Sequence, residues 1–262
     1  MQRSWAWWAS LALLSVTLAG LRSDASPSRP QPNPRMQHLP RLTVWAWERR
    51  EDLRAIDPVT TAVAYLDRTI ILDTRGLTVE PRRQPLLLPA SSALTRIPVV
   101  RIETSSGAVL TDVSAIAAAS EILKVPDPHS AALQIDFDAR SSEREWYRNV
   151  LARVRAQLPV GMPLSITALA SWCSYDNAWI KTLPIDEAVP MFFRMEPDRR
   201  RAASLGVLSR DEFTIREPRC MNSVGISTRE HWPPELAARR IYIFPDAGWQ
   251  QDGLKETVRQ LW

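Results

Sequence analysis

The stretch ALQIDFDARSS, residues 132–142, places two carboxylates at the end of a short apolar run. An unpaired charge is costly to bury, so such carboxylates usually lie where water, an opposite charge or a ligand can reach them. Asp136 and Asp138 are two residues apart, and side chains alternate along a strand, so both should point the same way. The stretch therefore predicts a buried strand whose far end faces a cleft.

Seven further runs share this character. Each is short, rich in β-branched or aromatic residues, and bounded by turn or charged residues, which is typical of parallel strands buried on both faces. Segments with helical periodicity lie between or after several of them, at residues 111–125, 141–158 and 253–261. About eight strands alternating with helices predict an α/β fold, a (β/α)8 barrel. The expected strands are residues 42–47, 62–66, 97–102, 132–137, 163–169, 188–193, 222–227 and 240–244.

One connection departs from the alternation. Residues 69–88 are typical of a hairpin centred on Arg75 and Gly76, in place of the second helix. An open doubly wound sheet is therefore the alternative fold. No glycine-rich turn follows the first expected strand, which weighs against a nucleotide-binding version of that sheet.

The N-terminal region predicts export. Residues 1–25 have a short basic head, an apolar core and small residues after it, which indicates a signal peptide or, alternatively, an N-terminal anchor. Residues 26–40 are proline-rich and polar, so we expect an extended tether. A single barrel domain should occupy residues 41–262. We expect a periplasmic or secreted protein that meets a membrane only through the N-terminal segment, if that segment is retained.

Composition and charge indicate which classes of partner to expect. The 262 residues are 45% hydrophobic with a net charge of +4, as in ordinary globular proteins. The basic residues are scattered and form no stripe with interleaved aromatics, so we expect no nucleic-acid partner. Cys173 and Cys220 could form a disulfide in an exported chain. The expected strands place them near opposite ends of the barrel, however, which leaves the bridge open.

Cofactor chemistry has little support in the sequence. No cluster of histidines and cysteines has the spacing of a zinc site, and no G-x-S-x-G elbow is present. We therefore expect no cofactor and no bound metal. A hard cation held by Asp136 and Asp138 stays open as an alternative.

The expected strand ends carry carboxylates, an arginine and tryptophans. In a barrel the catalytic groups gather at the C-terminal strand ends, where carboxylates can cleave glycosidic bonds and indoles can cover sugar rings. These residues therefore predict a carbohydrate as the partner. Asp136 could instead be structural, paired with Arg101 or Arg194, and tryptophans are core residues by default. The candidate catalytic residues are Asp138, Asp136, Glu48, Asp67 and Glu196, and the candidate substrate-binding residues are Trp47, Trp172, Arg194 and Trp249.

Five separated motifs carry a resemblance to a known family. LTVWAWERREDL, LQIDFDARSSEREWY, LSITALASWC, AVPMFFRM and CMNSVGIS together resemble exported bacterial proteins grouped as domain of unknown function 3142, from about Leu42 onward. This resemblance implies a glycoside-hydrolase-like barrel without an assigned activity. The chain is more distantly similar to family 18 glycoside hydrolases, whose fourth strand ends in D-x-x-D-x-D-x-E. Here Leu133 and Arg140 replace the first aspartate and the glutamate.

Two functional hypotheses follow. An arginine does not donate a proton at neutral pH, so a glycoside hydrolase would need an acid from another strand, such as Glu48, Asp67 or Glu196. Asp138 would then be the nucleophile or base, with Asp136 as its electrostatic partner. The second hypothesis is a non-catalytic carbohydrate-binding or scaffold protein on the same barrel.

Overall fold

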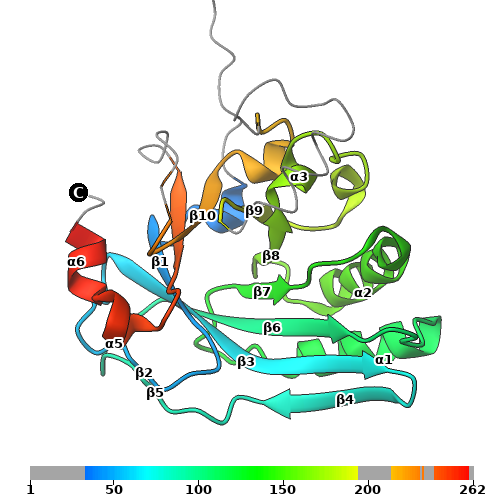
Figure 1. Cartoon of the computed structure of the whole chain (residues 1–262), viewed down its shortest axis with the longest axis horizontal. Coiled ribbons are helices and arrows are strands. Elements are labelled where there is room, and N and C mark those ends of the chain that lie inside the picture. The colour runs from blue at the N-terminus through cyan, green and yellow to red at the C-terminus, as the bar shows by residue number, and fades with distance from the viewer. Residues whose placement is uncertain (1–32, 194–213, 231, 233–238, 260–262) are drawn as a thin grey trace, which may run out of the picture.

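A computed structural model describes residues 33–193, 214–230, 232 and 239–259 (Figure 1). Eight parallel strands within this part follow one another around a barrel, and the first pairs with both the second and the last, which closes it. The predicted (β/α)8-type barrel is confirmed, and the open sheet is wrong. The strands are β1 (Leu42–Ala46), β3 (Thr61–Asp73), β6 (Arg96–Thr104), β7 (Leu133–Asp136), β8 (Leu164–Leu169), β9 (Glu187–Met191), β10 (Ser223–Ser227) and β11 (Arg240–Phe244).

The predicted hairpin is also present. Strand β3 runs past the barrel to Asp73 and pairs antiparallel with β4 (Gly76–Pro81), which lies along its outer side (Figure 1). Asp73 Oδ1 accepts hydrogen bonds from the backbone N–H groups of Arg75 and Gly76 at 2.7 and 3.2 Å. Gly76 has φ +128°, a value that glycine adopts without a Cβ clash. A two-stranded sheet, β2 (Glu51–Asp52) with β5 (Leu86–Leu87), flanks the barrel.

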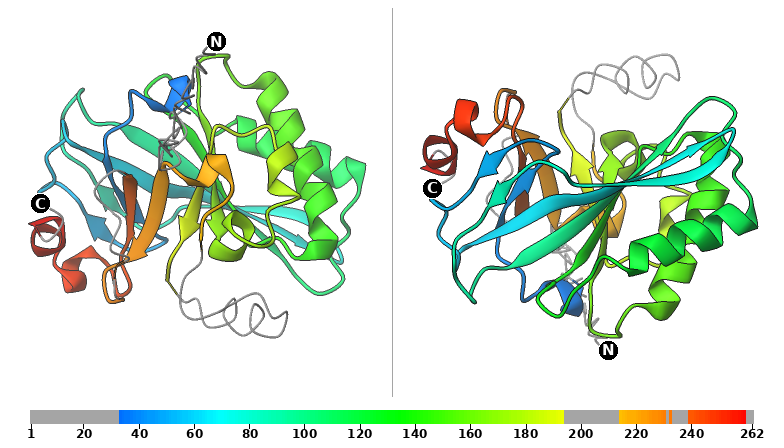
Figure 2. Two further views of the ribbon diagram at one scale, coloured as in Figure 1. Left: turned by 90° about the horizontal axis from the view of Figure 1, so that it is seen from above. Right: turned by 90° about the horizontal axis from the view of Figure 1, so that it is seen from below.

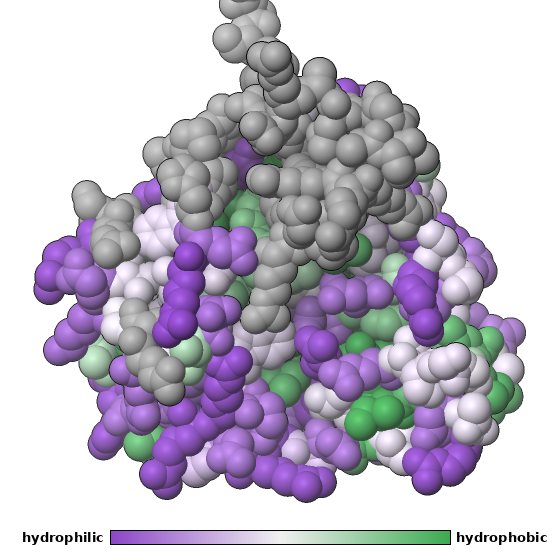
Figure 3. Space-filling model, in the orientation of Figure 1, coloured by the Kyte–Doolittle hydropathy of each residue, from purple (hydrophilic) through white to green (hydrophobic). Residues whose placement is uncertain are grey.

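The helices form a partial outer layer, with α1 and α2 covering one side of the barrel (Figure 2). Helix α1 buries Ala115, Ala118 and Ile122, and its start is capped by the Thr111 side chain. On its outer side Val113 and Ile116 are 75% and 48% exposed. Figure 3 shows apolar surface among polar residues at the lower right of this view. The described helices are α1 (Asp112–Leu123), α2 (Arg144–Gln157), α3 (Ala170–Cys173), α5 (Trp249–Asp252) and α6 (Leu254–Arg259), with one-turn 3-10 helices η1 (Pro34–Met36), η2 (Ser141–Glu143), η3 (Ile180–Thr182) and η4 (Pro218–Cys220).

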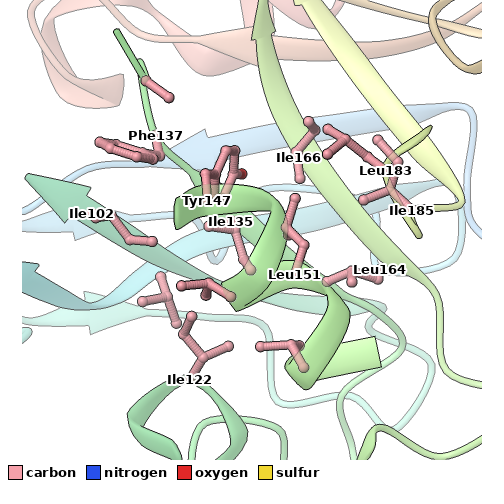
Figure 4. Packing of buried hydrophobic residues seen from close by; sticks show 14 of the residues in the cluster. Ile102, Ile122, Ile135, Phe137, Tyr147, Leu151, Leu164, Ile166, Leu183 and Ile185 are labelled. Atoms are coloured by element: carbon pink, nitrogen blue, oxygen red, sulfur yellow. The ribbon is translucent and has the colours of Figure 1, made fainter. Parts of the chain in front are cut away.

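The largest apolar core lies between the barrel wall and these helices. Figure 4 shows Ile135 of β7 and Ile166 of β8 beside Tyr147 and Leu151 of α2. All of these side chains are fully buried. Alternate strand residues face outward into this layer and the others face into the barrel. Burial on both faces explains why the strands appear in the sequence as continuous apolar runs.

The barrel interior holds a buried polar network. Trp45 Nε1 donates to Gln134 Oε1 at 2.8 Å, while Arg240 Nη1 and the Tyr242 hydroxyl donate to Glu187 at 2.6 and 2.8 Å. Burial, and then the charge of Glu187, raise the pKa of Tyr242 well above its usual value. Each buried charge therefore has an opposite charge or a hydrogen-bond partner, as the cost of burial requires.

The segment before β1 corrects the expected tether. Met36 and Leu39 are 2% and 6% exposed, and Arg35 forms an ion pair with Asp186 at 2.8 Å. Arg240 Nη2 donates to the Met36 carbonyl at 2.5 Å. Residues 33–40 therefore belong to the folded domain, because two apolar side chains among the prolines dock on the barrel. The expected signal segment 1–25 lies outside the described residues, and within them no helix is long and apolar enough to cross a membrane.

The two cysteines form a disulfide, which the sequence had left open. Cys173, at the end of α3, is bonded to Cys220 of η4, with the two Cα atoms 5.8 Å apart and both side chains fully buried. The backbone N–H groups of Arg216 and Glu217 donate to the Cys173 carbonyl. The chain before β10 thus lies against α3, which removes the separation that the strand ends implied.

Candidate functional site

Two adjoining pockets lie at the mouth of the barrel, where the parallel strands end. We call them the β7 pocket and the β1 pocket; their volumes are about 370 and 330 Å³, and both are lined by Arg101 and Glu103. The β7 pocket is also lined by Asp136, Asp138, Arg140 and Glu143, and the β1 pocket by Trp47, Glu48, Arg49, Phe193, Phe244 and Asp246. Because Arg101 and Glu103 line both, the two pockets lie next to each other.

Arg101 lies at the junction of the two pockets. It is the register partner of Asp136 across β6 and β7, and its Nη1 donates to Asp136 Oδ2 at 2.9 Å. Its Nε donates to Glu103 Oε1 at 2.7 Å, and its guanidinium lies 5.5 Å from the Trp47 ring centroid. Burial alone would lower the pKa of Arg101, but Asp136, Glu103 and Asp138 raise it above its usual value. Arg101 is therefore a fixed positive charge at the centre of the mouth.

Asp136 holds this arginine in place. Its side chain is 5% exposed; besides Arg101, its Oδ1 accepts a hydrogen bond from Thr167 Oγ1 at 2.6 Å. The pairing with Arg101 was one of the alternatives open from the sequence. Asp138, two residues later and beyond the end of β7, is exposed and lines the same pocket. Of the two aspartates, Asp138 is the more accessible to a ligand.

Glu143 is a site residue that the sequence reasoning missed. Its side chain is 3% exposed and accepts hydrogen bonds from the Thr104 hydroxyl at 2.6 Å, the Arg140 backbone N–H at 2.7 Å and Arg140 Nε at 2.9 Å. Burial by itself would raise the pKa of Glu143, but these donors outweigh burial and lower it. The glutamate stands three residues after Arg140 at the start of a helix, and that capping-box spacing was the available signal.

Trp47 and Glu48 lie together in the β1 pocket, as expected of strand-end residues. The Trp47 ring is half-buried, with its centroid 4.3 Å from that of Trp45 and 6.2 Å from that of Phe244. Glu48 is exposed, and its Oε1 accepts hydrogen bonds from the backbone N–H groups of Arg83 and Gln84 at 2.9 and 3.0 Å. Glu48 thereby fixes the segment that follows the hairpin at the edge of the mouth.

Three expected site residues lie elsewhere. Strand β3 continues to Asp73, so Asp67 is in mid-strand, at a register shift; it pairs with Arg68 at 2.7 Å and lines neither pocket. Trp172 is 1% exposed in α3 and packs edge-on against Trp179. Trp249 is 2% exposed, and its Nε1 donates to the Trp45 carbonyl at 2.7 Å. Both indoles are structural because the chain after β8 and β11 folds back over the barrel and buries them.

Arg194 and Glu196, the two remaining candidates, lie outside the described residues. Within the part that the structure describes, no three His, Cys, Asp or Glu residues are grouped so as to hold a metal ion. The guanidinium of Arg101 already occupies one side of the Asp136 carboxylate, which does not favour a cation between Asp136 and Asp138.

The fold and its mouth define a (β/α)8-type barrel with arginines and carboxylates at the strand ends. No protein-family model matches the chain, and no curated protein matches it. Among solved structures the chain is similar to the Bacillus cereus spore cortex-lytic enzyme SleL, with a TM-score of 0.42 and 15% sequence identity over 71% of this chain and 50% of that one. The chain thus spans about half the length of that protein. The resemblance to domain of unknown function 3142 stays a prediction.

Proposed function

We propose that this protein binds a glycan across the two pockets and hydrolyses its glycosidic bonds, with Asp138 as the nucleophile or base. The observation that carries the proposal is the position of Asp138, exposed in the β7 pocket beside the fixed charge of Arg101. Glycosidic bonds are cleaved by carboxylates at such positions, and barrel enzymes place them at the C-terminal strand ends.

The adjoining residues suit a sugar chain. Trp47 lines the β1 pocket, and an indole there can pack against the C–H face of a sugar ring. Glu48 lines that pocket and Glu103 lines both pockets, so each is a candidate general acid. Asp136 is then the electrostatic partner that orients Arg101. A ligand of more than one sugar would span both pockets.

Export is part of the same proposal. The N-terminal sequence is typical of a signal peptide or anchor, and the Cys173–Cys220 disulfide supports an oxidising compartment outside the cytosol. A polysaccharide of a cell envelope or of the surroundings would be accessible there. We accordingly propose a periplasmic or secreted location.

A second candidate function is glycan binding without cleavage. Arg140 stands where the family 18 motif has its catalytic glutamate, and the donors around Glu143 lower the pKa of that nearby carboxyl. Neither residue can therefore supply a proton to a leaving group at neutral pH. This observation favours binding if no other acid reaches the bond.

The test compares the full chain with its Asp138→Asn variant on a panel of bacterial and plant polysaccharides. Released reducing ends and retained binding are both measured. Asp112→Asn is the control, because Asp112 is an exposed aspartate on α1 that lines neither pocket. Release that disappears only in Asp138→Asn supports hydrolysis, and equal release by that variant overturns the assignment. Binding without release favours the second function. The absence of both binding and release contradicts both functions.

A further inference from the structure

We infer that Arg140 is a substrate-contacting residue in the β7 pocket, where it donates a hydrogen bond to a sugar oxygen, and that Glu143 is its positioning residue. The inference deepens the proposed function and rests on its first part, glycan binding at the barrel mouth. It does not depend on hydrolysis. It assigns a role to the arginine that departs from the family 18 motif.

Glu143 fixes one edge of the guanidinium. Arg140 Nε and Nη2 donate to Glu143 Oε1 at 2.9 and 2.5 Å, and Nη2 also donates to Thr104 Oγ1 at 3.2 Å. The Glu143 carboxylate is almost fully buried, so it is held by the fold rather than by the surface. A planar guanidinium bound along one edge has few alternative orientations, and a ligand that meets it loses little conformational entropy.

The other edge of the guanidinium is available to a ligand. Nη1 of Arg140 has no hydrogen-bond partner among the described residues, and the side chain is 58% exposed although it lines the pocket. An arginine carries five N–H donors, and here the two on Nη1 stay unused. The arrangement therefore presents a fixed pair of donors to the β7 pocket.

Arg101 repeats the arrangement on another wall of the same pocket. Its Nε and Nη1 are bound by Glu103 and Asp136, while Nη2 has no partner among the described residues. Two guanidiniums, each anchored by a carboxylate, thus line one pocket with the exposed Asp138. Sugar hydroxyls both accept and donate hydrogen bonds, so they complement donors and a carboxylate acceptor at once.

The charges of the pocket bear on the class of glycan. Among its described lining residues, Arg101 and Arg140 are outnumbered by four carboxylates, Glu103, Asp136, Asp138 and Glu143. Both arginines are already paired with carboxylates, so a carboxylate on the ligand would meet excess negative charge. The pocket should therefore prefer an uncharged sugar to a uronic acid.

The experiment measures dissociation constants of the full chain for neutral hexasaccharides of glucose, xylose, mannose and N-acetylglucosamine, and for the acidic hexagalacturonate. We expect a neutral member to bind most tightly. Arg140→Gln should weaken that binding roughly 10- to 100-fold, the worth of a hydrogen bond from a charged donor. Arg140→Lys, which keeps the charge but not the planar fork, should also weaken it.

A double-mutant cycle tests the positioning role. Glu143→Gln should weaken binding as Arg140→Gln does, and the double variant should bind no worse than Arg140→Gln alone, because Glu143 acts through Arg140. Arg148 and Glu145 form another pair three residues apart, but on the exposed surface of α2. Arg148→Gln and Glu145→Gln are the matched controls and should leave binding within about twofold of the wild type, as expected for exposed charges.

The outcomes separate the two levels of the proposal. Wild-type binding that is unchanged in Arg140→Gln overturns this inference and leaves the proposed function standing. Additive losses in the double variant overturn the positioning role of Glu143, and tighter binding of hexagalacturonate overturns the preference for neutral sugars. No binding of any hexasaccharide by the wild type overturns the proposed function together with the inference. Thermal unfolding of each variant verifies folding, and Arg140, being largely exposed, keeps the test valid if Glu143→Gln fails to fold.

Discussion

Removing the Cys173–Cys220 disulfide should destabilise the fold by an amount set mainly by its loop. The two cysteines are 47 residues apart, and the chain-entropy relation for a loop of that length gives about 4 kcal/mol at 25 °C. The bridge ties α3 to η4, so its loss frees the whole connection from β8 to β10 in the unfolded chain. The double variant Cys173→Ala, Cys220→Ala should therefore lose about 4 kcal/mol of unfolding free energy.

Urea unfolding followed by tryptophan fluorescence measures this loss, with linear extrapolation to water. In thermal unfolding the same change corresponds to a fall in Tm of roughly 8–16 °C for a domain of this size. Wild type that is unfolded, reduced and refolded in reductant should match the variant, and reductant should not affect the variant. A difference below about 1 kcal/mol under oxidising conditions would mean that the bridge constrains little of the unfolded chain, contrary to this prediction.

Two further predictions concern the N-terminal segment and the β7 pocket. Met36→Ala should lower the unfolding free energy by about 2–5 kcal/mol, because Met36 is 2% exposed in the core; a change within about 0.5 kcal/mol in urea titration would mean that residues 33–40 are not docked in solution. The stability advantage of wild type over Glu143→Gln should be fully present above pH ~4.3, the usual value for an unfolded glutamate, and should shrink as the pH falls through the lowered pKa of the folded state. A difference that stays constant between about pH 7 and 3 would contradict this account.

The fold could be predicted because its strands are easy to recognise in the sequence. A strand buried on both faces is rich in apolar residues, so a run such as RIYIF at β11 stands out from the polar loops around it. The hairpin was predictable for a local reason as well, since Asp73 and Gly76 form the turn between two strand-like segments. Short-range chemistry determined both features.

The site was less predictable because it depends on contacts between distant residues. Asp136 and Asp138 were found through their spacing, but Trp172 and Trp249 look the same in the sequence as a mouth residue such as Trp47. Only the path of α3 and α5 decides that those two are buried. Glu143 looked like an ordinary first-turn helix residue, and its role needs Thr104 from another strand.

The docked N-terminal segment was hidden for a similar reason. Proline content suggests an extended chain, and composition does not reveal that Met36 and Leu39 have a place to pack. The partner residues Asp186 and Arg240 lie about 150 and 200 positions later in the chain. Such distant pairing leaves no local pattern in the sequence.

Backbone hydrogen exchange, with and without the hexasaccharide that binds most tightly, locates the glycan site. If the glycan binds at the barrel mouth, exchange should slow in residues 101–104 and 136–143, which line the β7 pocket, and should not change in the hairpin at 73–81. Protection confined to segments outside both pockets, with residues 101–104 and 136–143 unaffected, would contradict binding at the mouth.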